Sequence, residues 1–127
     1  MANHVNTSSP VSLIVLAAAA AGTLNSDNQL NELAKGVQVV VDVTVATTTS
    51  AVFKIQGYDI PSGKYYDLLT SAAITSTGTT VLTLYPGVTV ASNVAVSAPL
   101  PRIWRVNCVV TGGSSALTAT VGANVIV

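Results

Sequence analysis

Apolar and polar side chains alternate with a period of two along most of the chain. From Gly36 onward, valines at every second position share one face of an extended segment. The opposite face carries Gln38, Asp42 and Thr44. This alternation is typical of a β-strand with one buried face. The alternating valines are Val37, Val39, Val41, Val43 and Val45.

Further strands are predicted from the same alternation, from the apolar run at residues 11–16 and from the turn at residues 59–63. They cover residues 11–16, 51–58, 64–69, 79–85, 102–111 and 117–127. Residues 59–63 include Pro61 and Gly63, placed where a tight reversal of the chain needs them. Residues 51–69 are therefore predicted to form a β-hairpin. Pro-Gly and Gly-Gly pairs end two of the later strands.

The N-terminal part is less regular. Residues 1–10 are polar, contain the single histidine, His4, and are predicted to be an extended arm. The apolar segment that follows is too short to cross a bilayer and is predicted as a buried strand. Residues 22–35 are the most polar interior stretch, and are predicted as a long loop or a short helical turn held down by Leu30 and Leu33.

These elements predict an all-β protein. Seven to nine short strands with no convincing helix indicate a single antiparallel β-sandwich or a small barrel. A length of 127 residues suits one domain. We therefore expect one β-sandwich domain over residues 11–127, preceded by the arm at residues 1–10.

The composition narrows the possible functions. Apolar residues make up 50% of the chain and charged ones 8%, and five basic side chains balance five acidic ones. So much apolar surface excludes disorder. A net charge of zero argues against nucleic acid or an anionic membrane as a partner, since both select basic surfaces. Cys108 is the single cysteine, so no intrachain disulfide can form, which favours assembly in a reducing cytoplasm.

Few side chains in the sequence are suited to catalysis. His4 lies on the predicted arm, where packing cannot hold it against a nucleophile. One histidine, one cysteine and five scattered carboxylates show no metal-ligand spacing. Asp59 and Asp67 are predicted to form surface charge pairs with the nearby Lys54 and Lys64. We expect a protein that is not an enzyme and needs no cofactor.

Several side chains are candidates for an interface between proteins. Aromatic and arginine side chains are enriched at such interfaces. Arg102 and Arg105 lie three apart on a predicted strand, so they point to opposite faces and can anchor separate neighbours. The tyrosines and the tryptophan can also serve the core or form a sugar-binding platform. The candidate interface residues are His4, Tyr58, Tyr65, Tyr66, Arg102, Trp104 and Arg105.

Several segments resemble a group of small structural proteins from tailed bacteriophages. The similar segments are residues 57–72, 78–87, 100–106 and 115–123, and the resemblance covers about residues 36–127. It implies a non-enzymatic component of the virion, assembled in the host cytoplasm. The small size, the single β domain and the arm favour a capsid decoration or cement protein that binds itself, the major capsid protein, or both. The alternatives are a head–tail connector or tail component, or a carbohydrate-binding β-sandwich.

Overall fold

The structure, a computed structural model, describes residues 10–19, 21–46, 49–112 and 117–127. These ranges contain strands and no helix, which confirms the all-β prediction. The strands are β1 (Pro10–Ala19), β2 (Gly22–Asn25), β3 (Gln29–Leu30), β4 (Gly36–Ala46), β5 (Thr49–Asp59), β6 (Lys64–Thr70), β7 (Gly78–Leu84), β8 (Ala95–Val96), β9 (Ile103–Gly112) and β10 (Leu117–Ile126).

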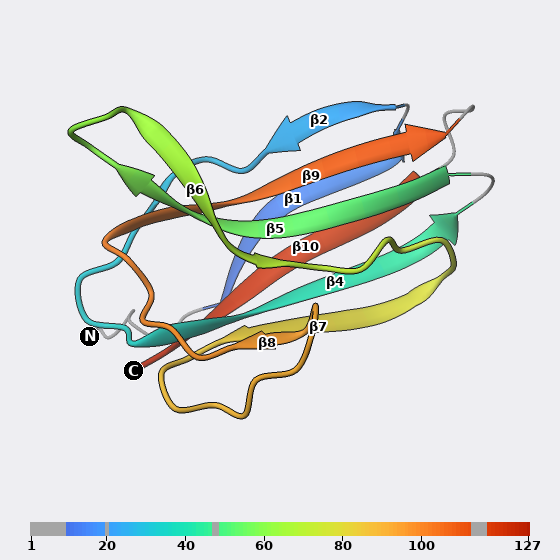
Figure 1. Cartoon of the computed structure of the whole chain (residues 1–127). Coiled ribbons are helices and arrows are strands. Elements are labelled where there is room, and N and C mark those ends of the chain that lie inside the picture. Colours follow the sequence, from blue (N-terminus) through green and yellow to red (C-terminus); the bar gives the residue numbers. More distant parts are fainter. Residues whose placement is uncertain (1–9, 20, 47–48, 113–116) are drawn as a thin grey trace, which may run out of the picture.

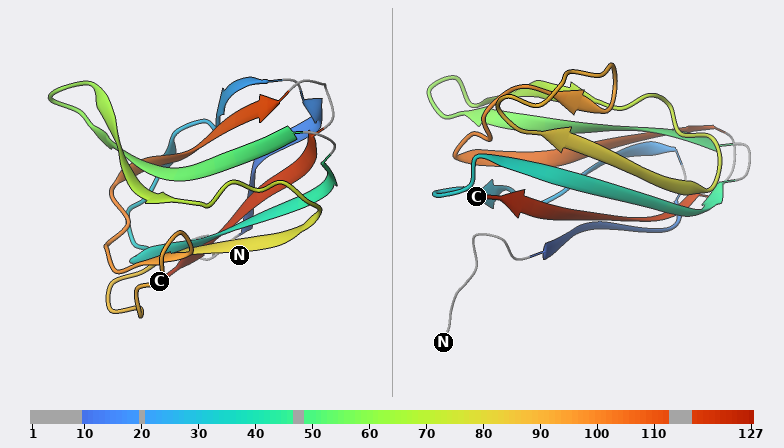
Figure 2. Two further views of the ribbon diagram at one scale, coloured as in Figure 1. Left: turned by 45° about the vertical axis from the view of Figure 1, so that its right-hand side comes forward. Right: turned by 90° about the horizontal axis from the view of Figure 1, so that it is seen from below.

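The strands form two open sheets stacked in a sandwich-like arrangement (Figures 1 and 2). Sheet A has the order β1-β10-β4-β7-β8, and sheet B has the order β2-β9-β5-β6, with β3 also paired to β9. The pairs are antiparallel except for β7 and β8, which run parallel. The sheets do not close into the small barrel that the sequence also allowed.

One apolar core lies between the two sheets. The inward side chains of β4 alternate with outward ones, as the period of two predicts. Strands β5 and β9 contribute the corresponding positions of sheet B, and this burial supplies the main driving force for folding. The largest fully buried side chains are Phe53, Ile55, Leu82, Leu84, Leu117, Val37, Val39, Val41, Val43, Val106, Val121 and Cys108.

Val45 is a correction to the predicted pattern of β4. It was expected to share the buried face of Val43, but it is exposed. The pairing of β4 with β10 shifts here, because Val43 pairs with Ala119 and Val45 pairs with the adjacent Thr118. Such a bulge inserts one extra residue into the strand and turns the following side chains to the other face.

Residues 22–35 also differ from the prediction. They contain the short strands β2 and β3, both paired with β9. Leu30 and Leu33 are 62% and 68% exposed, so they do not hold the segment down. Asn31 does so instead: its Nδ2 donates to the carbonyl of Ala34 at 2.9 Å and to that of Leu100 at 3.0 Å.

The predicted hairpin of residues 51–69 is confirmed as β5 and β6, and its turn projects from one end of the molecule (Figure 1). Asp59 shapes this turn, because its Oδ2 accepts hydrogen bonds from the backbone nitrogen of Ser62 at 3.2 Å and from the hydroxyl of Ser62 at 2.6 Å. Gly63 has a φ of +70°, a conformation that glycine adopts without steric cost. The predicted arm lies outside the described residues except for Pro10, which begins β1.

Candidate interaction surface

Three of the candidate interface residues meet on the outer face of sheet B. Tyr58 of β5 pairs with Tyr65 of β6, and Gln56 of β5 pairs with Arg105 of β9. Since β5 lies between β6 and β9, this register places the two tyrosines and Arg105 next to one another. The intervening positions of β5 and β9 point into the core.

The Arg105 side chain is held by two contacts. Its guanidinium carbon lies 3.4 Å from the centroid of the Tyr65 ring, a cation–π contact. Its Nε donates a hydrogen bond to Oε1 of Gln56 at 2.9 Å. Tyr65 is fixed in turn, because its hydroxyl donates to Oδ1 of Asn28 at 2.8 Å and its ring packs 4.7 Å from that of Tyr58.

Asp67 continues this network at the edge of the sheet. It accepts a hydrogen bond from Nε2 of Gln56 at 2.9 Å and forms an ion pair with Nζ of Lys54 at 3.2 Å. The hydrogen bond from Gln56 is the main reason why the pKa of Asp67 is lowered; Lys54 adds to the effect, while partial burial opposes it. The predicted charge pair is therefore confirmed for Asp67, whereas Asp59 forms no ion pair with another described residue and accepts hydrogen bonds from Ser62 in the turn instead.

The other candidate interface residues lie elsewhere. Trp104 is 2% exposed, so it belongs to the core and not to a surface. Tyr66 lies over Gly57, where its ring atoms occupy the space that a Cβ at that glycine would need. Arg102 precedes β9 and lies 3.7 Å from the carboxylate of the exposed Glu32. His4 is outside the described residues.

The sequence did not identify Gln56 and Asn28 as members of this surface. Gln56 lies at an outward position of β5, but its contacts depend on the register between β5, β6 and β9, which the sequence does not specify. Asn28 lies in the segment whose course was predicted incorrectly. No sequence signal distinguishes either residue from other exposed amides.

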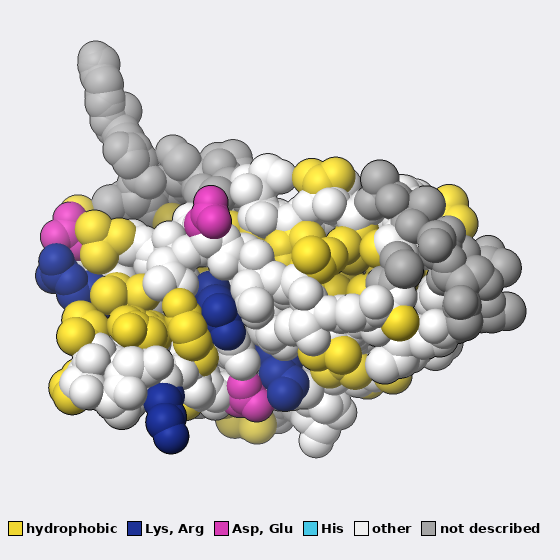
Figure 3. Space-filling model, turned by 90° about the horizontal axis from the view of Figure 1, so that it is seen from above, with side chains coloured by type: hydrophobic (Ala, Val, Ile, Leu, Met, Phe, Trp, Pro, Cys, Tyr) yellow, Lys and Arg dark blue, Asp and Glu magenta, His cyan; other side chains and the backbone are white. Residues whose placement is uncertain are grey.

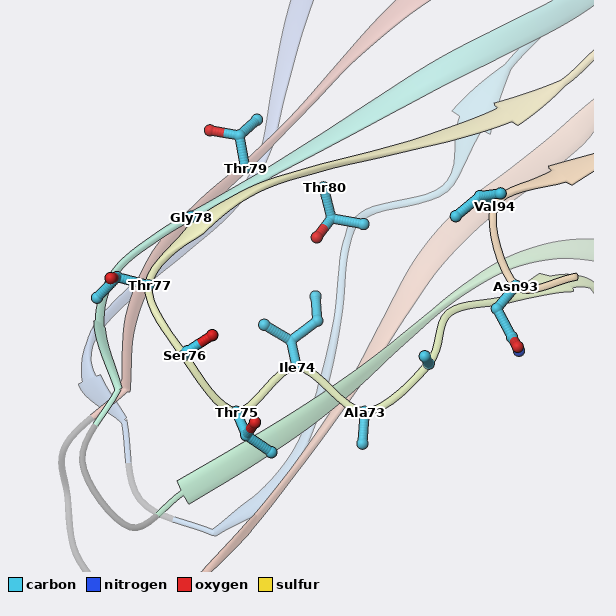
Figure 4. A pocket seen from close by; sticks show the side chains of 11 residues that line it. Ala73, Ile74, Thr75, Ser76, Thr77, Gly78, Thr79, Thr80, Asn93 and Val94 are labelled. Carbon is cyan, nitrogen blue, oxygen red and sulfur yellow. The ribbon is translucent and has the colours of Figure 1, made fainter. Parts of the chain in front are cut away.

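An open hollow of about 320 Å³ lies where the chain crosses from sheet B to sheet A (Figure 4). Its walls come from the segment before β7, from the start of β7, and from Asn93 and Val94. Serine and threonine hydroxyls dominate the lining, which contains no aromatic or charged side chain. Sugar sites use aromatic platforms and catalytic sites use titratable groups, so this hollow offers neither.

No three histidine, cysteine, aspartate or glutamate side chains of the described residues come together as metal ligands. Cys108 is buried, and burial raises the pKa of its thiol to about 12, so the reactive thiolate is disfavoured. Among the residues with assigned positions, no helix is long and apolar enough to cross a membrane.

Comparisons of the chain with protein-family models, with curated proteins and with solved structures find no match.

Proposed function

We propose that this chain is a non-enzymatic structural protein of a tailed-phage virion, and that it acts as a capsid decoration or cement protein. In this role the single β-sandwich domain binds other copies of itself and the major capsid protein. The resemblance of residues 57–72, 78–87, 100–106 and 115–123 to small phage structural proteins supports the assignment to a particle.

The observation that carries the proposal is the uneven distribution of charge between the two sheets. The strands of sheet A contain a single charged residue, Asp42, and Oγ1 of Thr79 donates a hydrogen bond to it at 3.2 Å. The strands of sheet B contain Lys54, Asp59, Lys64, Asp67 and Arg105. Protein interfaces are depleted in charge at their centres, so sheet A has the composition of a surface that becomes buried.

The outward side chains of sheet A support this argument. They are mainly threonine and valine, and they alternate with buried positions along each strand. On β4, β7 and β10 these outward residues include Gln38, Val40, Asp42, Thr44, Val45, Thr79, Val81, Thr83, Thr118, Thr120 and Asn124. The opposite side of the molecule differs, because Figure 3 shows basic and acidic side chains interspersed with apolar ones there.

Strand β1 forms the open edge of sheet A. Among the described residues it pairs only with β10, it carries no charged side chain, and Val15 is 69% exposed. Free monomers commonly protect edge strands with charged side chains or with β-bulges. Strand β1 lacks the first kind of protection, and its pairing with β10 shifts register at two places. An uncharged edge suits a molecule that is surrounded by copies of itself, and zero net charge avoids repulsion between those copies.

The carbohydrate-binding alternative receives less support. One face of the Tyr65 ring is covered by the Arg105 guanidinium, so it cannot stack on a sugar from that side. The head–tail connector and tail alternatives share the chemistry proposed here and differ in location. Electron microscopy of purified particles would distinguish these structural roles, because a decoration protein occupies the capsid surface and a connector or tail protein does not.

Val15→Lys tests the role of sheet A. A charged side chain there should weaken self-association and binding to capsid shells, measured by sedimentation, without unfolding the domain. Ile60→Lys is the matched control, because Ile60 is similarly exposed but lies in the β5–β6 turn. A wild-type protein that stays monomeric at high concentration and binds no shell would contradict the proposal.

A further inference from the structure

Neighbouring side chains hold the guanidinium of Arg105 in place, but only part of its hydrogen-bonding capacity is used. Its Nε donates to Gln56, and its guanidinium carbon lies over the Tyr65 ring, 3.4 Å from the centroid. Among the described residues, none accepts a hydrogen bond from its two terminal nitrogens, Nη1 and Nη2. Because the guanidinium is planar and rigid, one N–H group of Nη1 and one N–H group of Nη2 point in the same direction.

The surroundings hold the guanidinium in place before any ligand arrives. Tyr65 is fixed by its hydrogen bond to Asn28, and Gln56 is fixed by its hydrogen bond to Asp67. The residues on both sides of Arg105 are thus immobilised by other partners. Preorganisation of this kind lowers the entropic cost of binding, so more of the interaction energy contributes to affinity.

The charges on this surface do not balance. Lys54 and Asp67 form an ion pair at 3.2 Å, and no carboxylate of the described residues forms an ion pair with Arg105. Arg102, the other arginine, differs because Glu32 lies 3.7 Å from it. The cluster of Lys54, Asp67 and Arg105 therefore carries one excess positive charge, which a single negative charge would compensate.

We propose that Arg105, supported by Tyr65 and Gln56, is the anchor of a carboxylate-binding site on the outer face of sheet B. A carboxylate is planar and carries one negative charge, and its two oxygens match the two terminal guanidinium nitrogens. Its source is an aspartate or glutamate side chain of a partner protein. A phosphate dianion fits less well, because it would bring a second negative charge close to Asp67. The inference does not depend on the proposed role of sheet A, which lies on the other side of the molecule.

Nuclear magnetic resonance of the ¹⁵N-labelled full chain tests this site directly. The Nε–Hε signals of Arg105 and Arg102 are followed while sodium acetate replaces sodium chloride at constant ionic strength, and inorganic phosphate is used in a parallel titration. We expect acetate to shift the Arg105 signal saturably, with little change at Arg102. Similar, non-saturating shifts at both arginines would overturn the proposal, and saturation by phosphate but not by acetate would overturn the assignment to a carboxylate.

Variants separate binding from folding. In the variants, the backbone amide signal of Tyr65 serves as the readout. Arg105→Gln should abolish the saturable shift that acetate causes in this signal, whereas Arg102→Gln should leave that shift unchanged. Arg105→Lys keeps the charge but loses the paired donors, so acetate should bind roughly tenfold more weakly. The backbone amide spectrum shows whether each variant is folded, and if Arg105→Gln unfolds, the comparison of Arg105→Lys with the wild type decides. Unchanged acetate binding in a folded Arg105→Lys variant would contradict the proposed geometry.

Discussion

Trp104 was a candidate interface residue because of its residue type, but the structure places it in the core. Its side chain is 2% exposed and lies on the inner face of β9, next to the buried Val106. An aromatic side chain on a strand suits the core and an interface equally well, because both environments bury apolar area. The sequence could not decide between them, since the decision depends on which face of β9 meets sheet A.

We predict that Trp104→Ala lowers the free energy of unfolding by about 3–5 kcal/mol, because apolar contacts are lost and a cavity remains. Chemical denaturation followed by circular dichroism measures this change. Trp104→Phe, which keeps most of the apolar volume, should cost less. Equal stability of Trp104→Ala and the wild type would show that the side chain does not support the core.

Asp67 provides a second prediction at this scale. Its pKa is lowered mainly by the hydrogen bond from Gln56. We therefore predict that Gln56→Leu raises the pKa of Asp67 in an NMR pH titration, and that Lys54→Leu raises it as well. A carboxyl group with a lowered pKa stabilises the folded state above its unfolded pKa, and this contribution is lost as the pH falls through the lower folded value. An unchanged pKa of Asp67 in Gln56→Leu would show that the hydrogen bond from Gln56 does not lower it.

At the scale of elements, sequence patterns predicted the long strands and missed the short ones. Strands β4, β5, β7, β9 and β10 follow from alternation of apolar and polar residues, β6 follows from the predicted turn at residues 59–63, and β1 follows from a short apolar run. Strands β2, β3 and β8 have four residues or fewer, so no period can be read from them. They exist because neighbouring strands offer unpaired backbone groups, which is a property of the assembled sheet and not of the local sequence.

The segment around β3 yields a prediction for an element. Besides the bonds that its Nδ2 donates to Ala34 and Leu100, Asn31 accepts one at Oδ1 from the backbone nitrogen of Ala34 at 2.8 Å. Asn31→Ala should therefore destabilise the protein by about 1–3 kcal/mol in chemical denaturation, since partners are left unsatisfied. Leu33→Ala is the control, and because that side chain is exposed it should have little effect. A larger loss of stability in Leu33→Ala than in Asn31→Ala would support the original expectation that the leucines hold this segment.

For the whole molecule, the all-β class followed from the sequence, but the arrangement of the sheets did not. Period-two alternation shows that a strand has a buried face, and it leaves open which strands are neighbours. The interaction surface of Arg105, Tyr65 and Gln56 depends on that neighbourhood, because the three residues come from three strands. The sequence therefore identified Arg105 and Tyr65 as candidates by residue type and could not place them side by side.

The last prediction concerns the N-terminal segment and assembly. The core formed by the described residues begins at Ile14, and residues 2–9 are predicted from their polar sequence to be an extended arm. Deleting residues 2–9 should therefore leave the melting temperature of the isolated domain almost unchanged. If the segment binds a neighbouring subunit, the deletion should weaken self-association or capsid binding in sedimentation, because a segment that orders on a partner adds contact area only in the assembly. Assembly with full affinity after the deletion would show that the self-association proposed here relies on sheet A alone.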